Sequence, residues 1–240
     1  MRAALLALLL IGCAAEGPAP VTPAPTRAAA TPPPKASIVH IDVPRHAAEH
    51  GADFKADWSF DLVASAAWSA HVHVIPQGQI VPWHLHPEND ELVFVAAGQG
   101  SWLQAGGEFE VVAGQAVESA QGVVHGVRNR RPEALVTVVI QRPEFGQNWY
   151  VVPSEVAEPG ASTRMDDAGQ AFAGWSIDWW TGGQADGTAL YLVAEGVGEL
   201  SFESTRLPLR PGVFVKAPAG RPVRLEGEGL RILRVRIPEG

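Results

Sequence analysis

The sequence predicts an all-β protein built as a sandwich or a barrel. Short runs rich in valine and aromatic residues recur along the chain, and segments that contain glycine and proline separate them. Runs this short suit strands, and their regular punctuation is typical of β-sandwiches and barrels. We expect strands at residues 37–43, 58–65, 68–75, 80–86, 91–98, 100–104, 108–114, 123–129 and 134–141, with a hairpin tip at residues 105–107.

Composition sets broad limits on size and partners. The 240-residue chain can form one large or two small domains, and 46% hydrophobic with 18% charged residues is ordinary for a globular protein. A formal net charge of −8 argues against nucleic acid as a partner. The class of ligand must therefore come from motifs within the chain.

The N-terminus predicts export. Arg2 precedes an apolar run over residues 3–11, which is too short to cross a bilayer and is typical of a secretory signal peptide. Residues 10–13 resemble the bacterial lipobox, in which the cysteine is lipidated and becomes the first residue of the mature protein. Cys13 is the single cysteine of the chain, and lipidation explains an isolated cysteine in an exported protein. The alternative is an ordinary cleaved signal that happens to contain a cysteine.

We therefore divide off residues 1–12 as a lipoprotein signal peptide and residues 13–36 as a tether. The tether is rich in proline and alanine with almost no large apolar side chains, so it cannot bury a core and should be extended. Ala14 follows the cysteine. In similar lipoproteins that are retained in the inner membrane, this position is aspartate. The resemblance thus implies a lipid anchor in the outer membrane, with the protein facing the periplasm.

Residues 84–91 contain three side chains of types that bind metals. His84 and His86 are two positions apart, so on a strand both rings project from one face. Glu91 returns on the next strand after a turn at residues 87–90, and His125 follows a bend at residues 121–122. Three imidazoles and one carboxylate suit Fe, Mn, Ni, Cu or Zn and leave coordination positions open to substrate or water. The alternative is that these histidines lie on a solvated strand.

The spacing of these residues resembles the two sequence motifs of the cupin superfamily. The first comprises Gly78, His84, His86, Glu91 and Gly98, and the second comprises Gly114, Ala120, Gly122, His125 and Asn129, with alanine where the family usually has proline. The resemblance implies a jelly-roll (double-stranded β-helix) barrel. It also implies one divalent transition metal, with Fe or Mn favoured over Zn, Ni or Cu, held by His84, His86, Glu91 and His125. In some similar dioxygenases the ligand glutamate also takes a substrate proton, which makes Glu91 a candidate catalytic residue.

A second histidine pair precedes the first motif. His71 and His73 are two positions apart and therefore share one face of their strand. Aligned on the turn at residues 76–78, that face is the one that points into the barrel in similar cupins. His73 is then the second catalytic candidate, as a donor behind the ligands or a proton shuttle near neutral pH. The alternative places both imidazoles on the outer face of the sheet.

The second half of the chain repeats the first at an offset of 98 residues. This offset places Leu190 on Leu92 and Gly196 on Gly98. It replaces the four candidate ligands by Gly182, Gln184, Ala189 and Val223. We therefore expect a monomeric bicupin, with a metal-binding barrel at residues 37–150, a linker at residues 151–168 and a degenerate barrel without metal ligands at residues 169–240.

Two classes of function fit these features. The first is a metal-dependent enzyme, most readily a dioxygenase-type oxidoreductase, that acts on a small molecule at the cell envelope. The second is a non-catalytic lipoprotein that binds a metal, a sugar or a phenolic compound. A cupin isomerase or lyase is a further alternative, because one fold hosts many chemistries. Several tryptophans and one phenylalanine would line a pocket, stack on a ligand or pack the core: Trp83, Phe94, Trp102, Trp175, Trp179 and Trp180.

Overall fold

The computed structural model describes residues 38–50, 59–65, 67–143, 148–165, 170–172, 174–185, 189–218 and 220–237. The expected signal peptide, Cys13 and the expected tether lie outside these residues. Within them strands dominate, and the described helices are α1 (Val43–His50) and a 3-10 helix (Pro153–Glu155), which confirms the all-β prediction. Neither of these helices is long and apolar enough to cross a membrane.

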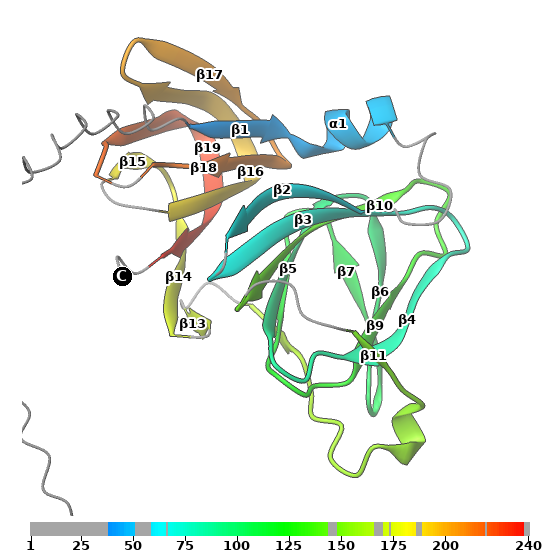
Figure 1. Cartoon of the computed structure of the whole chain (residues 1–240). Helices are drawn as coiled ribbons and strands as arrows, with labels where there is room; N and C mark the ends of the chain where they lie inside the picture. Colours follow the sequence, from blue (N-terminus) through cyan, green and yellow to red (C-terminus); the bar gives the residue numbers. More distant parts are fainter. Residues whose placement is uncertain are drawn as a thin grey trace, which may run out of the picture. The chain divides into compact units, whose positions relative to one another are not determined.

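The first half of the chain forms two antiparallel sheets (Figure 1). Its strands are β2 (Ser59–Ser65), β3 (Trp68–Ile75), β4 (Ile80–Leu85), β5 (Asp90–Ala97), β6 (Gln99–Gln104), β7 (Gly107–Val112), β8 (Ala116–Ser119), β9 (His125–Arg128), β10 (Leu135–Arg142), β11 (Trp149–Tyr150) and β12 (Thr163–Arg164). The six-stranded sheet has the order β12-β8-β5-β10-β3-β2, and the five-stranded sheet has the order β11-β4-β9-β6-β7. Buried residues from both sheets form one core, including Val93, Val95, Trp102 and Val127.

Strand β5 shows why the six-stranded sheet is buried on both faces. Val93 and Val95 point into the core of the first half, between its six-stranded and five-stranded sheets. Leu92 and Phe94 point to the opposite face and belong to a different core. Successive side chains of a strand point to opposite faces, so a strand buried on both sides is a continuous apolar run. The expected hairpin also forms, since β6 and β7 pair from Gln99↔Val112 to Gln104↔Gly107.

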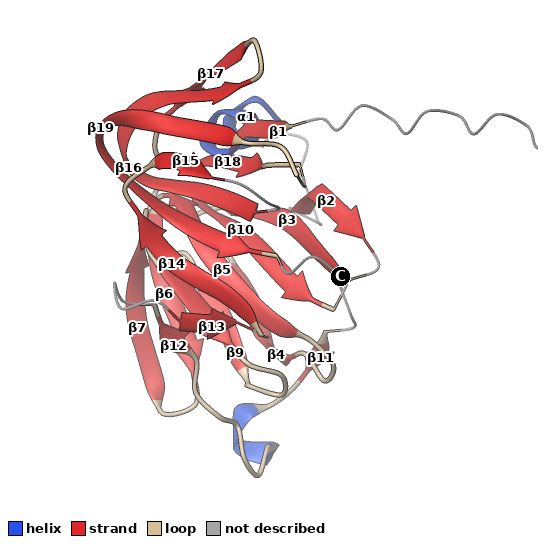
Figure 2. Ribbon diagram, turned by 90° about the vertical axis from the view of Figure 1, so that its left-hand side faces the viewer, coloured by secondary structure: helices blue, strands red, loops and turns tan. Residues whose placement is uncertain are grey.

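The remaining strands form an eight-stranded sheet with a core of its own. They are β1 (Val39–Asp42), β13 (Gln170–Phe172), β14 (Trp175–Trp180), β15 (Gly183–Ala185), β16 (Ala189–Phe202), β17 (Thr205–Leu209), β18 (Val213–Lys216) and β19 (Val223–Arg236). Their order is β1-β18-β16-β19-β14-β13, with β15 beside β19 and β17 beside β16 (Figure 2). The pairing of β16 with β19 shifts register around Glu195, and Val193 and Leu200, on either side of the shifts, pack in one core. The sheet therefore bends over its own apolar face.

A third core joins the six-stranded sheet to the eight-stranded sheet. Phe94 and Val138 from the first and Leu192 and Leu233 from the second are 0% exposed within it. Helix α1 packs at its edge, with one buried valine and one buried alanine, and contacts β5, β10 and β18. Burial of apolar surface between the sheets therefore joins the two halves into one compact unit, Ala36–Gly240.

The strand pairing corrects two expected boundaries. Residues 37–42 are expected in the metal-binding barrel, but β1 pairs with β18 of the eight-stranded sheet, from Val39↔Lys216 to Asp42↔Val213. Strand β1 covers an edge that would otherwise expose unpaired backbone groups. Residues 163–164 are expected in the linker, but β12 pairs with β8 and brings the buried side chain of Met165 to the core between the sheets.

The tryptophans of the second half favour the packing interpretation. Trp175 is 2% exposed, and its ring meets that of Trp68 edge to face, with 5.9 Å between centroids. Trp179 packs against the core between the sheets, and Trp180 packs against the core of the eight-stranded sheet. Large aromatic side chains supply much of the apolar area that such cores bury.

Two motif glycines, Gly78 and Gly98, provide a test of how closely the backbone packs in the first half. Gly78 and Gly98 both have φ of +77°, which costs an alanine about 1–2 kcal/mol at either position. A Cβ at Gly98 would overlap the carbonyl oxygen of Ala134, whereas one at Gly78 would meet nothing within 4 Å. We expect Gly98→Ala to reduce the free energy of unfolding by about 1–3 kcal/mol more than Gly78→Ala does. Urea unfolding measures the difference, and equal losses would contradict the close approach at Gly98.

Candidate metal centre

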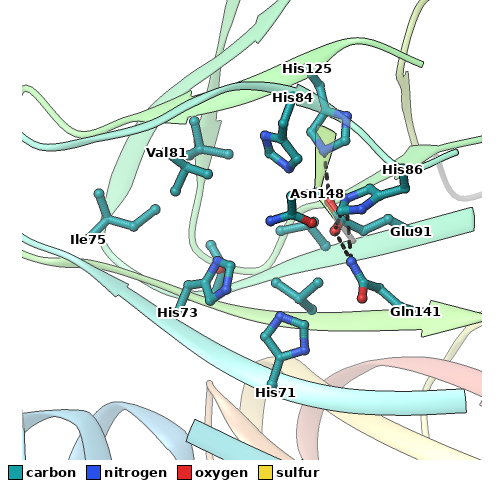
Figure 3. A pocket seen from close by; sticks show the side chains of 14 residues that line it. His71, His73, Ile75, Val81, His84, His86, Glu91, His125, Gln141 and Asn148 are labelled. Atoms are coloured by element: carbon teal, nitrogen blue, oxygen red, sulfur yellow. Dashed lines mark hydrogen bonds and ion pairs between the residues drawn. The ribbon is translucent and has the colours of Figure 1, made fainter. Parts of the chain in front are cut away.

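The four candidate ligands come from neighbouring parts of both sheets of the first half. His84 in β4 pairs with His125 at the start of β9, in the five-stranded sheet. His86 directly follows β4, and Glu91 is the second residue of β5 in the six-stranded sheet. All four are buried, and the ligand atoms that they offer lie within 4.8 Å of one another. The structure therefore brings together residues that the sequence spreads over 42 positions (Figure 3).

Glu91 lies at the centre of the cluster. Its Oε1 is 3.0 Å from Nε2 of His125, and its Oε2 is 2.9 Å from Nε2 of His86. The ring of His84 packs against that of His125, with 4.4 Å between centroids. One carboxylate thus faces imidazole nitrogens with each of its oxygens.

Backbone carbonyls set the orientation of two of the rings. Nδ1 of His84 donates to the carbonyl oxygen of Pro82 at 2.7 Å, and Nδ1 of His125 donates to that of Val123 at 3.0 Å. A carbonyl oxygen only accepts hydrogen bonds, so each Nδ1 carries the proton and Nε2 is the nitrogen left for a metal. Hydrogen bonds of this kind fix ring orientation and tautomer in metal sites.

The charges of the cluster are coupled. Burial disfavours the charged form of Glu91, but His86 and His125 outweigh burial and hold the pKa of this carboxyl well below its ordinary value. Burial also opposes protonation of His125, but its hydrogen bond to Glu91 and the charge of that carboxylate raise the net pKa. Burial lowers the pKa of His84 to about 4, so this ring is neutral at neutral pH. A negative carboxylate beside imidazoles is the electrostatic environment that a cation requires.

These residues fit a divalent transition metal. Three imidazoles and one carboxylate are the donors that Fe, Mn and related ions take in proteins, and two of the imidazoles are already turned toward the centre. The four residues could therefore hold one such ion.

The comparisons with known proteins agree with this geometry. Residues 70–141, which contain all four candidate ligands, match the family described as the Cupin domain. Residues 70–141 are a cupin domain. No curated protein sequence matches this chain significantly.

Solved structures show the same fold over more of the chain. Salicylate 1,2-dioxygenase from Pseudaminobacter salicylatoxidans is 14% identical, with a TM-score of 0.62 over 85% of this chain and 84% of that chain. A Cupin 2 conserved barrel domain protein from Leptotrichia buccalis is 13% identical, with a TM-score of 0.58 over 85% of this chain and 99% of that chain. Protein Ylba from E. coli is 11% identical, with a TM-score of 0.58 over 87% of this chain and 97% of that chain. At these identities the likeness concerns the fold.

A cavity of about 20 Å³, measured as the space open to the centre of a water molecule, lies beside the cluster in the cupin domain. It has room for little more than one or two waters. Its wall combines the four candidate ligands with other polar residues and with apolar ones: His71, His73, Thr137, Gln141, Asn148, Ile75, Val81, Val93, Val127 and Val139. None of the described lining residues is Lys or Arg.

His71 and His73 both face this cavity, so the inward alternative is the one that the structure shows (Figure 3). Their ring centroids are 4.8 Å apart. Burial lowers the pKa of each to about 4, and the neighbouring His71 contributes to the shift at His73. Both rings are therefore neutral at neutral pH, and each has an unprotonated nitrogen that can accept a hydrogen bond.

Only part of the aromatic expectation holds. Trp102 stacks in parallel on His125, with 5.2 Å between centroids, and supports the cluster from behind. Phe94 faces the core between the six-stranded and eight-stranded sheets, because it lies three positions from Glu91 and so on the opposite face of β5. Trp83 lines a separate groove with Pro153.

Sequence reasoning missed three polar residues of the cavity. Thr137 and Gln141 lie on β10 and are 2% and 1% exposed, and Asn148 precedes β11. The available signal was a glutamine and a threonine within the otherwise apolar run of residues 135–141. Buried polar side chains in such a run usually have a specific partner.

The eight-stranded sheet carries a different arrangement at the corresponding positions. Ala189 pairs with Arg236 as Glu91 pairs with Gln141, and Asp178 pairs with Arg234 as His71 pairs with Val139. Arg234 donates to both oxygens of Asp178, at 2.8 and 2.5 Å, and Arg236 donates to Oδ2 of the same carboxylate at 2.8 Å. An ion-pair cluster therefore occupies the positions of His71, Val139 and Gln141 of the cupin domain, and alanine replaces the candidate ligand Glu91.

Removal of one ligand tests the assignment directly. His86→Ala should weaken binding of Mn²⁺ or Co²⁺ by well over 100-fold, because even loss of a partner behind a ligand costs roughly 10- to 100-fold. Gln184→Ala is the matched control, because Gln184 is the exposed counterpart of His86 at the 98-residue offset. Isothermal titration calorimetry compares the two. Unchanged affinity in His86→Ala would exclude His86 as a ligand.

Proposed function

We propose that the protein is a metal-dependent enzyme with dioxygenase-type oxidoreductase chemistry that acts on a small molecule at the cell envelope. The convergence of His84, His86, Glu91 and His125 on one enclosed cavity carries the proposal. The fold neighbours support it, since they include salicylate 1,2-dioxygenase, which also has a structure with gentisate. In a dioxygenase reaction both atoms of O₂ enter the substrate, so no separate reductant is consumed.

Fe or Mn suits the proposal best. A set of imidazoles with one carboxylate and open positions is typical of ions that activate dioxygen. When bound, the ion supplies Lewis acidity and an open coordination position. His84, His86, Glu91 and His125 would hold it, and the single carboxylate would contribute one negative charge to the centre.

The remaining lining residues position the substrate and exclude water. His73, neutral because burial lowers its pKa to about 4, accepts a hydrogen bond from a substrate hydroxyl through its unprotonated ring nitrogen. His71, beside it, is neutral for the same reason. Val93, Val127 and Val139 line the cavity with apolar surface, which limits access of bulk water. In this proposal Glu91 also receives a substrate proton as the substrate binds.

The size of the cavity favours a second candidate, a protein that binds metal without turnover. Space for one or two waters suffices to complete the coordination of an ion but does not hold an aromatic substrate without movement of the wall. A metal-binding role would require the four ligands alone. An enzymatic role also requires the histidine pair.

The histidine pair therefore separates the two candidates. His73→Phe should lower kcat for substrate-dependent O₂ consumption roughly 10²-fold while metal content stays unchanged, because it removes the hydrogen bond that orients the substrate. His40→Phe, on β1 of the eight-stranded sheet, is the control and should leave the rate unchanged. An oxygen electrode with the Fe- or Mn-loaded protein and a panel of phenolic substrates provides the measurement. Tight metal binding without turnover of any of these substrates would favour the binding protein.

We also propose that the protein is exported and anchored by acyl chains on Cys13, as a monomer on the periplasmic face of the outer membrane. The apolar run before Cys13, the lipobox-like residues 10–13 and the isolated cysteine support this proposal. A tether of residues 13–36 would separate the folded unit from the lipid surface.

Cys13→Ser should abolish partitioning into the detergent phase of Triton X-114 and leave the unfolding transition of the folded unit unchanged. The wild-type protein should partition with the membrane fraction. Recovery of wild-type protein in the soluble periplasmic fraction would contradict the anchor without affecting the enzymatic proposal.

A further inference from the structure

Gln141 is a buried polar side chain that directly contacts the candidate metal ligands. It lies on β10 and is 1% exposed. In the register of the six-stranded sheet it is paired with Glu91 of β5 on one side and with Ser69 of β3 on the other. The backbone of the sheet therefore places its amide next to the carboxylate of Glu91.

The amide donates to the carboxylate. Nε2 of Gln141 is 2.8 Å from Oε2 of Glu91, and the same nitrogen is 3.4 Å from Nε2 of His86 (Figure 3). The opposite amide orientation would set two acceptors, the amide oxygen and the carboxylate, against each other. Only the donating orientation satisfies the carboxylate.

The amide oxygen shows that this orientation has a cost. Oε1 of Gln141 is buried and makes no hydrogen bond within the described part of the chain. A buried acceptor without a partner is destabilising. An apolar side chain of the same length would avoid this cost, so packing alone does not account for a glutamine at this position. The contact with Glu91 does.

We propose that Gln141 is a positioning residue, which holds the carboxylate of Glu91 in the orientation that binds the ion. This inference rests on the metal-binding role proposed above. The hydrogen bond ties one carboxylate oxygen to β10 and leaves the carboxylate a restricted set of orientations among His86 and His125. Because the amide is neutral, it does so without adding a second negative charge to the centre. Glu91 is then already ordered before the ion binds, so metal binding does not include the entropic cost of ordering this side chain.

Two substitutions that remove the donor test the proposal. Gln141→Met preserves the length of the side chain, and Gln141→Leu preserves an apolar shape of similar volume. Both should weaken Mn²⁺ or Co²⁺ binding roughly 10- to 100-fold, which is the effect of removing a hydrogen-bonded partner of a metal ligand. The visible absorption of bound Co²⁺ should also shift, because it reports how the carboxylate coordinates.

Thr137→Val is the matched control. Thr137 lies on the same strand and face, is 2% exposed and lines the same cavity. It is four positions from Gln141, and the substitution is isosteric. Its metal affinity and Co²⁺ spectrum should equal those of the wild type.

Thermal unfolding of the metal-free proteins distinguishes positioning from a structural role. The proposal predicts that metal-free Gln141→Met and Gln141→Leu unfold close to the wild-type temperature, because each loses a hydrogen bond to the buried carboxylate but also removes a buried amide oxygen without a partner. Unchanged affinity and spectrum in both variants, or an affinity loss matched by a lower unfolding temperature in both, would overturn the proposal. If the wild-type protein binds neither ion, the metal-binding role itself fails, which is a separate outcome.

Discussion

The site depends on the burial of one carboxylate, that of Glu91. Removal of a carboxylate from water costs several kcal/mol unless other groups compensate for the lost hydration. Here His86, His125 and Gln141 do so, each within 3.0 Å of a carboxylate oxygen. The three come from different parts of the barrel, so their convergence constrains the register of β5, β9 and β10 together. A slip of one residue in β5 would turn Glu91 into the apolar core between the six-stranded and eight-stranded sheets.

The two halves of the chain use one strand arrangement for different chemistry. In the first half, the inward positions of β3, β5 and β10 hold histidine, glutamate and glutamine around a cavity. In the second, positions of the same pairing register hold Asp178, Arg234 and Arg236 in a partly exposed ion-pair cluster. The two guanidinium groups balance the carboxylate of Asp178 there, so this carboxylate needs no additional cation. The apolar faces between the six-stranded and eight-stranded sheets connect the halves, and they place the cupin domain beside a sheet whose described residues form no comparable cluster of His, Cys, Asp or Glu.

The chemistry of the cavity follows from its neutrality. Burial holds His71 and His73 in their neutral forms, and the described wall contains no lysine or arginine. A bound ion would then supply positive charge, and a ligand would be selected by its affinity for that ion and by hydrogen bonds to imidazole and amide groups. An anchor of the Arg–carboxylate type would give different selectivity, because it recognises an anionic group without the metal.

The local sequence determined much of this protein. Alternation and punctuation in runs such as residues 68–75 and 91–98 predicted strands, because side chains repeat with a period of two. The spacing of His84, His86, Glu91 and His125 predicted a common site, because two histidines on one strand face and a return after a turn leave few other arrangements. The offset of 98 residues showed that Ala189 replaces Glu91 in the second half.

Only the tertiary structure decided the long-range features. Strands β1 and β18 pair although their first residues, Val39 and Val213, are 174 positions apart. This pairing depends on which edge of the eight-stranded sheet is left uncovered by the other strands. Whether His71 and His73 face inward depends on the register of β3 against β10, and the role of Gln141 depends on the register of β10 against β5. Sequence patterns report which residues share a face of one strand. The partner of each face is set by contacts between segments far apart in the chain, and no local pattern records them.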